Sequence, residues 1–171
     1  MTKKRKNVTI AFFVIGLILS GLMLFIAFYS TSLFPEYNEE NTVEHSATVS
    51  GVETSDKVCT IYVLQYRCGL KIKLSEIVCD EYLSELQPGS NITFRVPDFY
   101  DQWLTDGDTE ELSIVALQTE NADIVTFESH NVSERRDAKK GKIIGCVFSA
   151  IFFAGAAACA VLLIVDKRKI N

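Results

Sequence analysis

Two long apolar runs without a charged residue constrain this chain more than any other feature. Val8–Tyr29 has 18 apolar residues out of 22, and Ile143–Val165 has 20 out of 23. A hydrocarbon core about 30 Å thick is crossed by about 20 helical residues, and a single helix satisfies its own backbone in lipid. Both runs are therefore predicted to be transmembrane helices. The first run is longer than a signal-peptide core and has no small-x-small cleavage site after it, so we expect an uncleaved anchor.

The charges outside the two runs predict an orientation. The N-terminal tail, residues 1–7, has four basic residues and no acid, and the C-terminal tail, residues 166–171, has three basic residues and one acid. By the positive-inside rule both tails are expected in the cytoplasm and residues 30–142 outside it, with the protein in the cell membrane. One cluster before the second run is basic as well: Arg135, Arg136, Lys139, Lys140 and Lys142. We interpret it as a snorkelling collar at the membrane interface, with binding of lipid headgroup phosphates as the alternative.

Small residues recur at a spacing of four in both apolar runs. Such positions let two helix backbones approach closely, which predicts either an intramolecular hairpin or a homodimer. The candidate packing positions are Gly16, Ser20, Gly141, Gly145, Gly155, Ala156 and Ala160. Neither run contains an ionisable Asp, Glu, Lys, Arg or His, which argues against a proton relay or an ion-coupled transporter.

The segment between the two runs is long enough for one small domain. Thr31–Lys142 has 21 acidic and 10 basic residues, and a net charge of this sign disfavours nucleic acid as a partner. We expect residues 30–42 to be a linker, 43–128 a β domain, and 129–142 a juxtamembrane helix that continues into the second span, residues 143–165.

Several short segments of the middle domain have strand patterns. The predicted strands are Val43–Thr54 with a bulge at Gly51, Val58–Tyr66, Leu70–Leu74, Asn91–Val96, Leu112–Gln118 and Asp123–Phe127. Ser75–Leu86 is predicted to be one short helix that ends before Pro88-Gly89. The predicted fold class is a membrane α+β protein, in which two transmembrane helices flank a small OB-like β-barrel with one short helix; a β-sandwich is the alternative.

The order of these segments resembles a family. A basic tail and a membrane helix are followed by the strand ATVSGVE (Ala47–Glu53), a hairpin, the turn and strand LQPGSNITF (Leu86–Phe94), and a second membrane helix. This order is similar to a broad family of small bacterial proteins of unknown function, which have two transmembrane helices and a β-rich extracytoplasmic domain between them. Ser90 stands where that family often has Asp. The resemblance implies a fold and a topology but no activity.

Three cysteines lie in the middle domain, an odd number: Cys59, Cys68 and Cys79. A hairpin centred near Arg67-Cys68 places Cys59 opposite Ser75–Ile77, which makes Cys79 its nearest cysteine partner. A Cys59–Cys79 disulfide is therefore favoured over Cys68–Cys79 in an oxidising compartment. Three unpaired thiols are the alternative. The cysteine spacings do not fit a zinc site, and we expect no metal and no cofactor.

The segment Asp98–Glu111 is expected to be a loop rich in aromatic and acidic residues. Phe99, Tyr100 and the single tryptophan, Trp103, are candidates for a partner-recognition loop, because exposed aromatic residues often anchor partners. The alternatives are a solvated loop whose Phe99 or Trp103 closes one end of the barrel, and a calcium site, for which the EF-hand spacing is missing.

The sequence contains no recognised catalytic motif, and its two histidines, His45 and His130, are expected on the surface. We therefore expect an integral membrane protein that serves as a non-enzymatic interaction or assembly module of the cell envelope. Its expected partners are the lipid bilayer and another envelope protein or a second copy of itself. Two alternatives remain: a membrane-bound thiol or hydrolytic enzyme, and an accessory subunit of an oligomeric channel or transporter.

Overall fold

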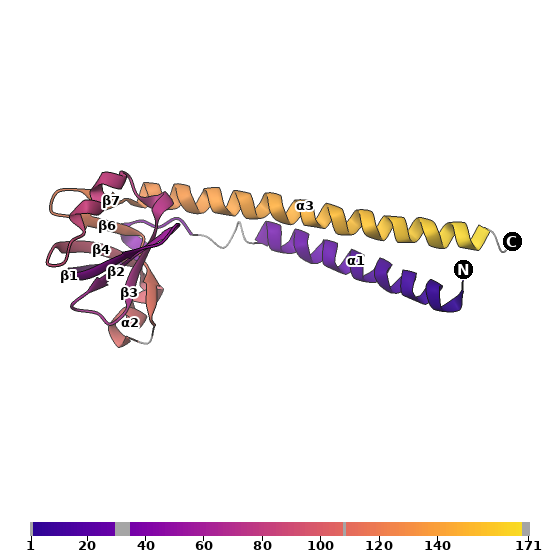
Figure 1. The fold of residues 1–171 in the computed structure, drawn as a ribbon, viewed down its shortest axis with the longest axis horizontal. Helices are drawn as coiled ribbons and strands as arrows, with labels where there is room; N and C mark the ends of the chain where they lie inside the picture. The colour runs from indigo at the N-terminus through magenta and orange to yellow at the C-terminus, as the bar shows by residue number, and fades with distance from the viewer. Residues whose placement is uncertain (1, 30–34, 108, 169–171) are drawn as a thin grey trace. The chain divides into compact units, whose positions relative to one another are not determined.

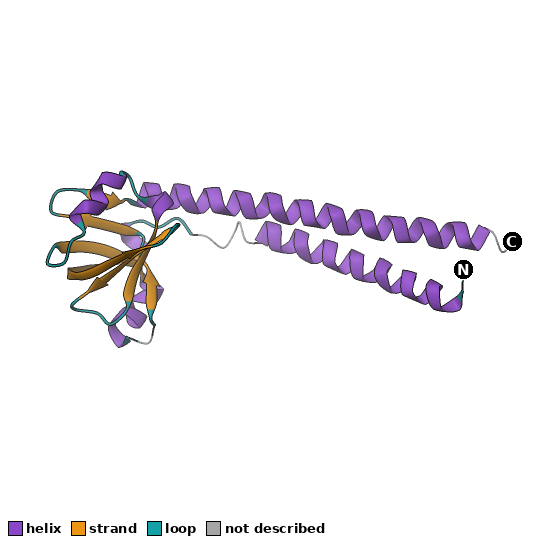
Figure 2. Cartoon of the chain, viewed as in Figure 1, coloured by secondary structure: helices purple, strands orange, loops and turns teal. Residues whose placement is uncertain are grey.

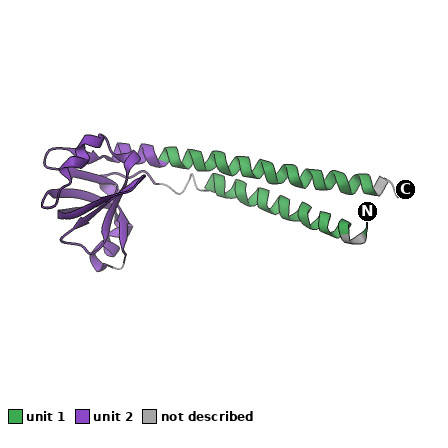
Figure 3. Cartoon of the chain, in the orientation of Figure 1, with its two compact units in different colours: residues 1–34, 135–171 green, residues 35–134 purple. Residues whose placement is uncertain are grey.

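A computed structural model describes residues 2–29, 35–107 and 109–168. It divides into two compact units, one comprising residues 1–34 and 135–171 and the other residues 35–134 (Figure 3). The second unit extends beyond the predicted β domain, residues 43–128, at both ends. The predicted linker, residues 30–42, lies partly outside the described residues, and its described part contains a short 3-10 helix, η2 (Glu39–Asn41). The predicted tails also extend past the described residues, to Met1 at one end and to 169–171 at the other.

Two long helices contain the two apolar runs. They are α1 (Lys3–Tyr29) and α3 (Phe127–Arg168) (Figure 1). Both are long and apolar enough to cross a membrane, and only 11% of the most apolar window of each is buried. A core helix of a soluble protein would be mostly buried, so α1 and α3 do not have the burial of core helices. The single helix α3 covers both the predicted juxtamembrane helix, residues 129–142, and the second predicted span.

Seven strands form one mixed sheet in the described part of residues 35–134 (Figure 2). The strands are β1 (Thr42–Thr54), β2 (Val58–Val63), β3 (Gly69–Lys73), β4 (Asn91–Pro97), β5 (Glu111–Ser113), β6 (Ala116–Thr119) and β7 (Asp123–Val125). Their order is β5-β3-β2-β1-β4-β6-β7. The long strand β1 pairs with both β2 and β4, and its register with β2 shifts between Val49 and Gly51. The predicted bulge at Gly51 and the hairpin of β2 with β3 are thereby confirmed.

The predicted strand Leu112–Gln118 is wrong as a single element, because two different partners divide it. β5 pairs in parallel with β3, whereas β6 pairs antiparallel with β4 and β7. Only Ile114 and Val115 separate β5 from β6, and their backbone amides donate to the carbonyls of Lys71 on β3 and Arg95 on β4 at 3.1 and 2.9 Å. This segment therefore bonds in turn to strands on both sides of β1 in the sheet order.

Two further elements differ from the predictions. Ser75–Leu86 is not one α-helix but two 3-10 helices, η3 (Leu74–Glu76) and η4 (Asp80–Glu85). The two 3-10 helices are separated because the residues between them pair with β7. Ile77 forms a β-bridge with Val125, and the Val78 amide donates to the Ile124 carbonyl at 2.9 Å. These bonds to β7 hold residues 77–78 extended.

The predicted loop Asp98–Glu111 contains a helix, α2 (Asp98–Asp106). Pro97 precedes it, Asp98 and Asp101 lie in its first turn, and Gly107 ends it at φ +69°. Acidic residues in a first turn complement the helix dipole, and glycine adopts the left-handed conformation of a helix end at little cost. Its buried residue is Leu104, so neither Phe99 nor Trp103 closes the end of the sheet.

The core of this unit is made largely of strand residues. Alternate residues of β1, β2, β3 and β4 point into it, together with Leu104 of α2. Its largest members with almost no exposed surface are Ile61, Leu70, Ile72, Ile92, Phe94, Leu104, Ile114, Leu117 and Ile124.

Candidate functional site

The small residues of α1 and α3 meet in pairs within their unit. A Cβ added at Gly16 would lie 3.1 Å from the Cβ of Ala156, and one at Gly145 would lie 2.7 Å from the Cβ of Ala27. Ser20 and Ser149 lie between these pairs and are buried, with their hydroxyl oxygens 2.9 Å apart. The helices thus run antiparallel and pack through their smallest side chains, an arrangement that is common between membrane helices.

Four of the seven predicted packing positions, Gly16, Ser20, Gly145 and Ala156, lie at this interface. An added Cβ at Gly141 or Gly155 would meet nothing within 4 Å, and Ala160 is half-buried. Ala27 and Ser149 also lie at this interface, and neither was among the predicted positions. A seven-residue spacing in the sequence could have indicated both residues. Ser20 and Ala27 on α1 are seven residues apart, as are Ser149 and Ala156 on α3.

The basic cluster lies on one stretch of α3. Four of its members, Arg135, Arg136, Lys139 and Lys140, are exposed. The fifth, Lys142, is half-buried and places its ammonium group 4.5 Å from the centre of the Phe28 ring, a cation–π distance. An aromatic ring and a lysine at this level are typical of a membrane interface. This contact is compatible with the predicted collar.

The aromatic residues of α2 form a stack. The rings of Phe99 and Tyr100 have centroids 4.2 Å apart, and those of Tyr100 and Trp103 are 5.0 Å apart. Tyr100 is half-buried against the core, whereas Phe99 is 59% and Trp103 51% exposed. The three predicted recognition residues therefore lie together on a helix rather than on a loop.

A hydrogen-bonded relay fastens α2 to the sheet. His45 on β1 contacts Asp101 of α2 through Nε2 at 2.7 Å, and its Nδ1 lies 3.0 Å from the hydroxyl of Tyr66. With the proton on Nε2, the imidazole donates to Asp101 and accepts from Tyr66. The ring also stacks on the buried Phe94 at a centroid distance of 5.6 Å. The predicted surface position of His45 is wrong, because its side chain is only 14% exposed.

An aspartate, a histidine and a hydroxyl in this order resemble the arrangement that activates a nucleophile. In this structure, the surroundings of the Tyr66 hydroxyl oppose its activation as a nucleophile. Burial first, and then the negative charge of Asp101, raise the pKa of the Tyr66 hydroxyl above its ordinary value of 10.0. A nucleophile is activated by a lowered pKa or a poised base, so this relay serves better as a structural clamp.

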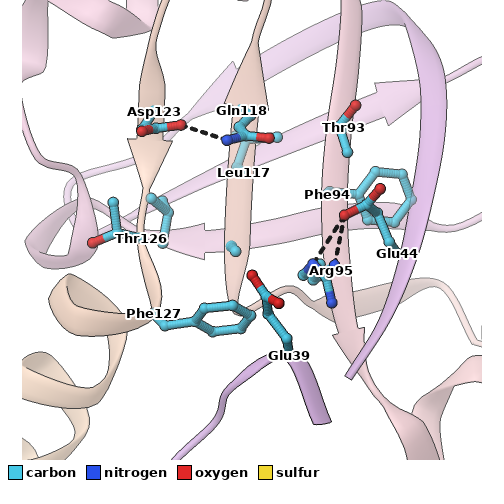
Figure 4. A pocket seen from close by; sticks show the side chains of 12 residues that line it. Glu39, Glu44, Thr93, Phe94, Arg95, Leu117, Gln118, Asp123, Thr126 and Phe127 are labelled. Carbon is cyan, nitrogen blue, oxygen red and sulfur yellow. Dashed lines mark hydrogen bonds and ion pairs between the residues drawn. The ribbon is translucent and has the colours of Figure 1, made fainter. Parts of the chain in front are cut away.

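A shallow pocket lies beside β4 and β6 (Figure 4). Its volume is about 230 Å³, below the range of about 300–1,000 Å³ common for ligand sites. Arg95 is already engaged, because Nε and Nη2 donate to Glu44 at 3.1 and 2.7 Å and Nη1 donates to Thr42 at 3.3 Å. Glu39 and Asp123 leave the pocket with an excess of negative charge. These features fit a small cationic group better than an anion.

The cysteines of the β domain are free thiols in the structure. Cys59 lies opposite Ile72 in the hairpin, so its predicted place opposite Ser75–Ile77 is wrong and the Cys59–Cys79 bridge loses its geometric basis. Cys59 and Cys68 are buried, and this burial raises the pKa of both thiols above 9.0. A raised pKa reduces the thiolate fraction, whereas reactive cysteines have lowered values.

A buried polar cluster lies where η3 meets the first turns of α3. Glu76, His130 and Glu134 place one potential ligand atom each within 4.8 Å of one another. Glu76 is 2% exposed and His130 6%, so the predicted surface position of His130 is also wrong. Sequence reasoning missed this cluster because Glu76 is distant along the chain, although the spacing of His130 and Glu134 puts both on one face of a helix.

Comparisons with protein-family models, with curated proteins and with solved structures found no match.

Proposed function

We propose that this protein is a membrane-anchored interaction or assembly module of the cell envelope, which presents its β domain on the extracytoplasmic side. The proposal rests on one observation above all: two large aromatic side chains, Phe99 and Trp103, are more than half exposed on a short helix that has its own buried residue, Leu104. Contiguous exposed aromatic surface marks interaction sites more often than isolated apolar residues do.

The attachment of α2 supports this interpretation. Leu104 anchors the helix in the core, and Asp101 bonds to His45 of β1. Phe99 and Trp103 therefore need to lose little further conformational freedom when a partner binds. Preorganised aromatic residues of this kind are typical of binding hot spots.

We further infer that the sheet is an OB-like closed barrel rather than a sandwich. The support is the segment 111–119, which pairs in parallel with β3 at one end and antiparallel with β4 at the other. A long, bulged first strand that pairs with both its neighbours also fits a small Greek-key barrel.

The two apolar helices support the anchor, and the basic residues at both chain ends support cytoplasmic termini, with residues 30–142 outside. The resemblance to the bacterial two-helix family agrees with this topology. A thiol enzyme has less support, because burial raises the pKa of Cys59 and Cys68. A hydrolytic site at Tyr66 has less support for the same physical reason.

The test is site-specific crosslinking in intact cells. A photoreactive amino acid at Phe99 or Trp103 should capture a defined envelope protein, or a second copy of the chain, as one discrete product. The same amino acid at Leu64, an apolar residue that directly follows β2 and is 71% exposed, serves as the matched control and should capture no such product.

Two variants sharpen the result. Phe99→Ser with Trp103→Ser should abolish copurification of the captured partner, while Leu64→Ser should preserve it. Equal capture from all three positions, or copurification that survives the double substitution, would show that α2 is not the recognition surface.

A further inference from the structure

We propose that Glu76, His130 and Glu134 form a binding site for a divalent transition-metal ion of the zinc class. The three side chains converge from two elements, η3 for Glu76 and the first turns of α3 for His130 and Glu134. One imidazole and two carboxylates are a donor set that suits Zn²⁺, with a fourth position left for water or a further ligand.

Two buried atoms of this cluster have no hydrogen-bond partner among the described residues. They are Oε1 of Glu76 and Nδ1 of His130. Nδ1 lies 3.2 Å from the other oxygen of Glu76, but the direction of this contact does not make a hydrogen bond. Leaving such atoms unsatisfied destabilises the folded state, and a cation bound between them removes that cost.

The ligand atoms of the three side chains need to move only a little closer together to bind a tetrahedral ion. Bonds of about 2.0–2.2 Å from a tetrahedral ion set its ligand atoms about 3.4 Å apart. The three candidate atoms already lie within 4.8 Å of one another. A rotamer change of Glu134, whose side chain is 18% exposed, can supply the remaining convergence without moving the backbone.

The ammonium group of Lys73 on β3 neutralises part of the negative charge of Glu76 and Glu134. It contacts Glu134 and lies 3.8 Å from Oε1 of Glu76. Two carboxylates carry a charge of −2, which a divalent ion balances fully and one ammonium group balances only by half. Lys73 is 40% exposed and can turn toward water when the ion enters.

The surroundings hold the two elements in place. The hydroxyls of Ser75 and Ser133 lie 2.9 Å apart beside the cluster. On the other side, the amide of Tyr37 donates to Asn131 at 3.0 Å, and Asn131 donates back to the Tyr37 carbonyl at 2.9 Å. The Tyr37 ring lies 5.5 Å from His130 between centroids. This support resembles the outer contacts that orient metal ligands.

The test is a Zn²⁺ titration of the full-length, untagged protein in detergent micelles, in competition with a chromophoric chelator. We expect one equivalent to bind, with Mg²⁺ failing to compete because it prefers an octahedral oxygen shell. Glu76→Gln and His130→Gln should each weaken binding at least tenfold. His45→Gln is the matched control, since His45 is the only other histidine of the chain, and it should bind Zn²⁺ as the wild type does.

Lys73→Met provides a test with the opposite sign, because removal of the competing ammonium group should tighten Zn²⁺ binding. A spectroscopic measurement on the wild type does not depend on the folding of any variant. X-ray absorption of the zinc complex should show one imidazole and oxygen ligands. The proposal is overturned by the absence of a stoichiometric site, by sulfur ligation, or by folded Glu76→Gln and His130→Gln proteins that bind as tightly as the wild type.

Discussion

The hydroxyl oxygens of Ser20 and Ser149 lie 2.9 Å apart at the buried centre of the α1–α3 interface, and Ser149 also lies 3.0 Å from the Ser20 carbonyl oxygen. They form a polar contact between the two close approaches at Gly16–Ala156 and Gly145–Ala27. Hydroxyl bonds between membrane helices have measured values averaging about 0.6 kcal/mol, because the separated helices find other partners. The contact therefore contributes more to the register of the two helices than to their affinity.

Ser149→Ala should reduce the stability of the helix pair by about 0.6 kcal/mol and no more than about 1.7 kcal/mol. The loss of the hydroxyl leaves Ser20 with its own backbone as an alternative partner, which keeps the effect small. Reversible unfolding in mixed micelles measures it. A control substitution, Ala154→Ser on an exposed position of α3, should leave stability unchanged. A loss above about 3 kcal/mol would mean that the hydroxyl pair does more than fix the register.

Gly145→Leu should disrupt the same interface severely. An added Cβ would already lie 2.7 Å from the Cβ of Ala27 and 3.3 Å from the Met23 carbonyl oxygen, so a larger side chain forces the helices apart. Gly155→Leu is the matched control, because nothing lies within 4 Å of an added Cβ there. Reversible unfolding in mixed micelles compares the two variants. A free energy of unfolding for Gly145→Leu equal to that of Gly155→Leu would contradict the packing.

Gly69→Ala should destabilise the β domain by about 1–3 kcal/mol, the usual range for overpacking. The added methyl would lie 2.6 Å from Cγ2 of Thr60 and 3.3 Å from the ring of Tyr62, at the point where β3 begins its pairing with β5. Thr60 is buried and β-branched, so its side chain has little freedom to move. Urea unfolding of the full-length protein in detergent gives the comparison with Gly51→Ala. There the nearest atom is 3.9 Å away, and we expect a smaller change.

Cys59 and Cys68 should resist alkylation at pH 8 in the folded protein, whereas half-buried Cys79 should react faster. Burial removes access and also raises the pKa of the first two thiols above 9.0, which lowers the fraction of reactive thiolate. Timed iodoacetamide labelling followed by peptide mass spectrometry distinguishes the three cysteines. Rapid labelling of Cys59 would contradict its burial. If no disulfide-linked peptide that contains Cys59 is found, a bridge to Cys79 is excluded.

The raised pKa values of Cys59 and Cys68 make the free energy of unfolding depend on pH. The folded pKa values of Cys59 and Cys68 lie above their unfolded values, so the unfolded state loses protons first as the pH rises. Their contribution to stability is therefore complete below about pH 9 and declines as the pH rises toward the folded values. Replacement of Cys59 with Ala should flatten this decline in a urea unfolding series from pH 8 to pH 10, whatever it does to the absolute stability.

Much of the architecture could be predicted from local patterns. The apolar runs, the strand β1 with its bulge at Gly51, and the β2–β3 hairpin depend on composition and alternation, which neighbouring residues already contain. The errors arose where distant partners decided the outcome. Leu112–Gln118 has one continuous strand pattern, yet β3 takes its first part and β4 its last. Bonds to β7 likewise divide the predicted helix after Glu76.

The helix α2 could have been predicted, because Pro97 and Gly107 mark its ends. The cluster of Glu76, His130 and Glu134 could not, since nothing near Glu76 in the sequence indicates that α3 covers it. The same holds for His45, whose partners Tyr66 and Asp101 come from other parts of the chain. Sequence patterns therefore located the elements, while tertiary contacts determined which histidines are buried.

The relay through His45 predicts the behaviour of α2. Asp101→Ala removes the acceptor of the His45 Nε2–H and frees the helix from β1, which should cost about 1 kcal/mol because the carboxylate is partly exposed. Asp106→Ala is the matched control on the same helix. Asp106 is exposed in the last turn, where a negative charge opposes the helix dipole, so its removal should leave stability unchanged or slightly higher. Trp103, the only tryptophan, reports the local environment by fluorescence during urea unfolding. Identical unfolding midpoints for the two variants would mean that the His45–Asp101 contact does not hold α2 against the sheet.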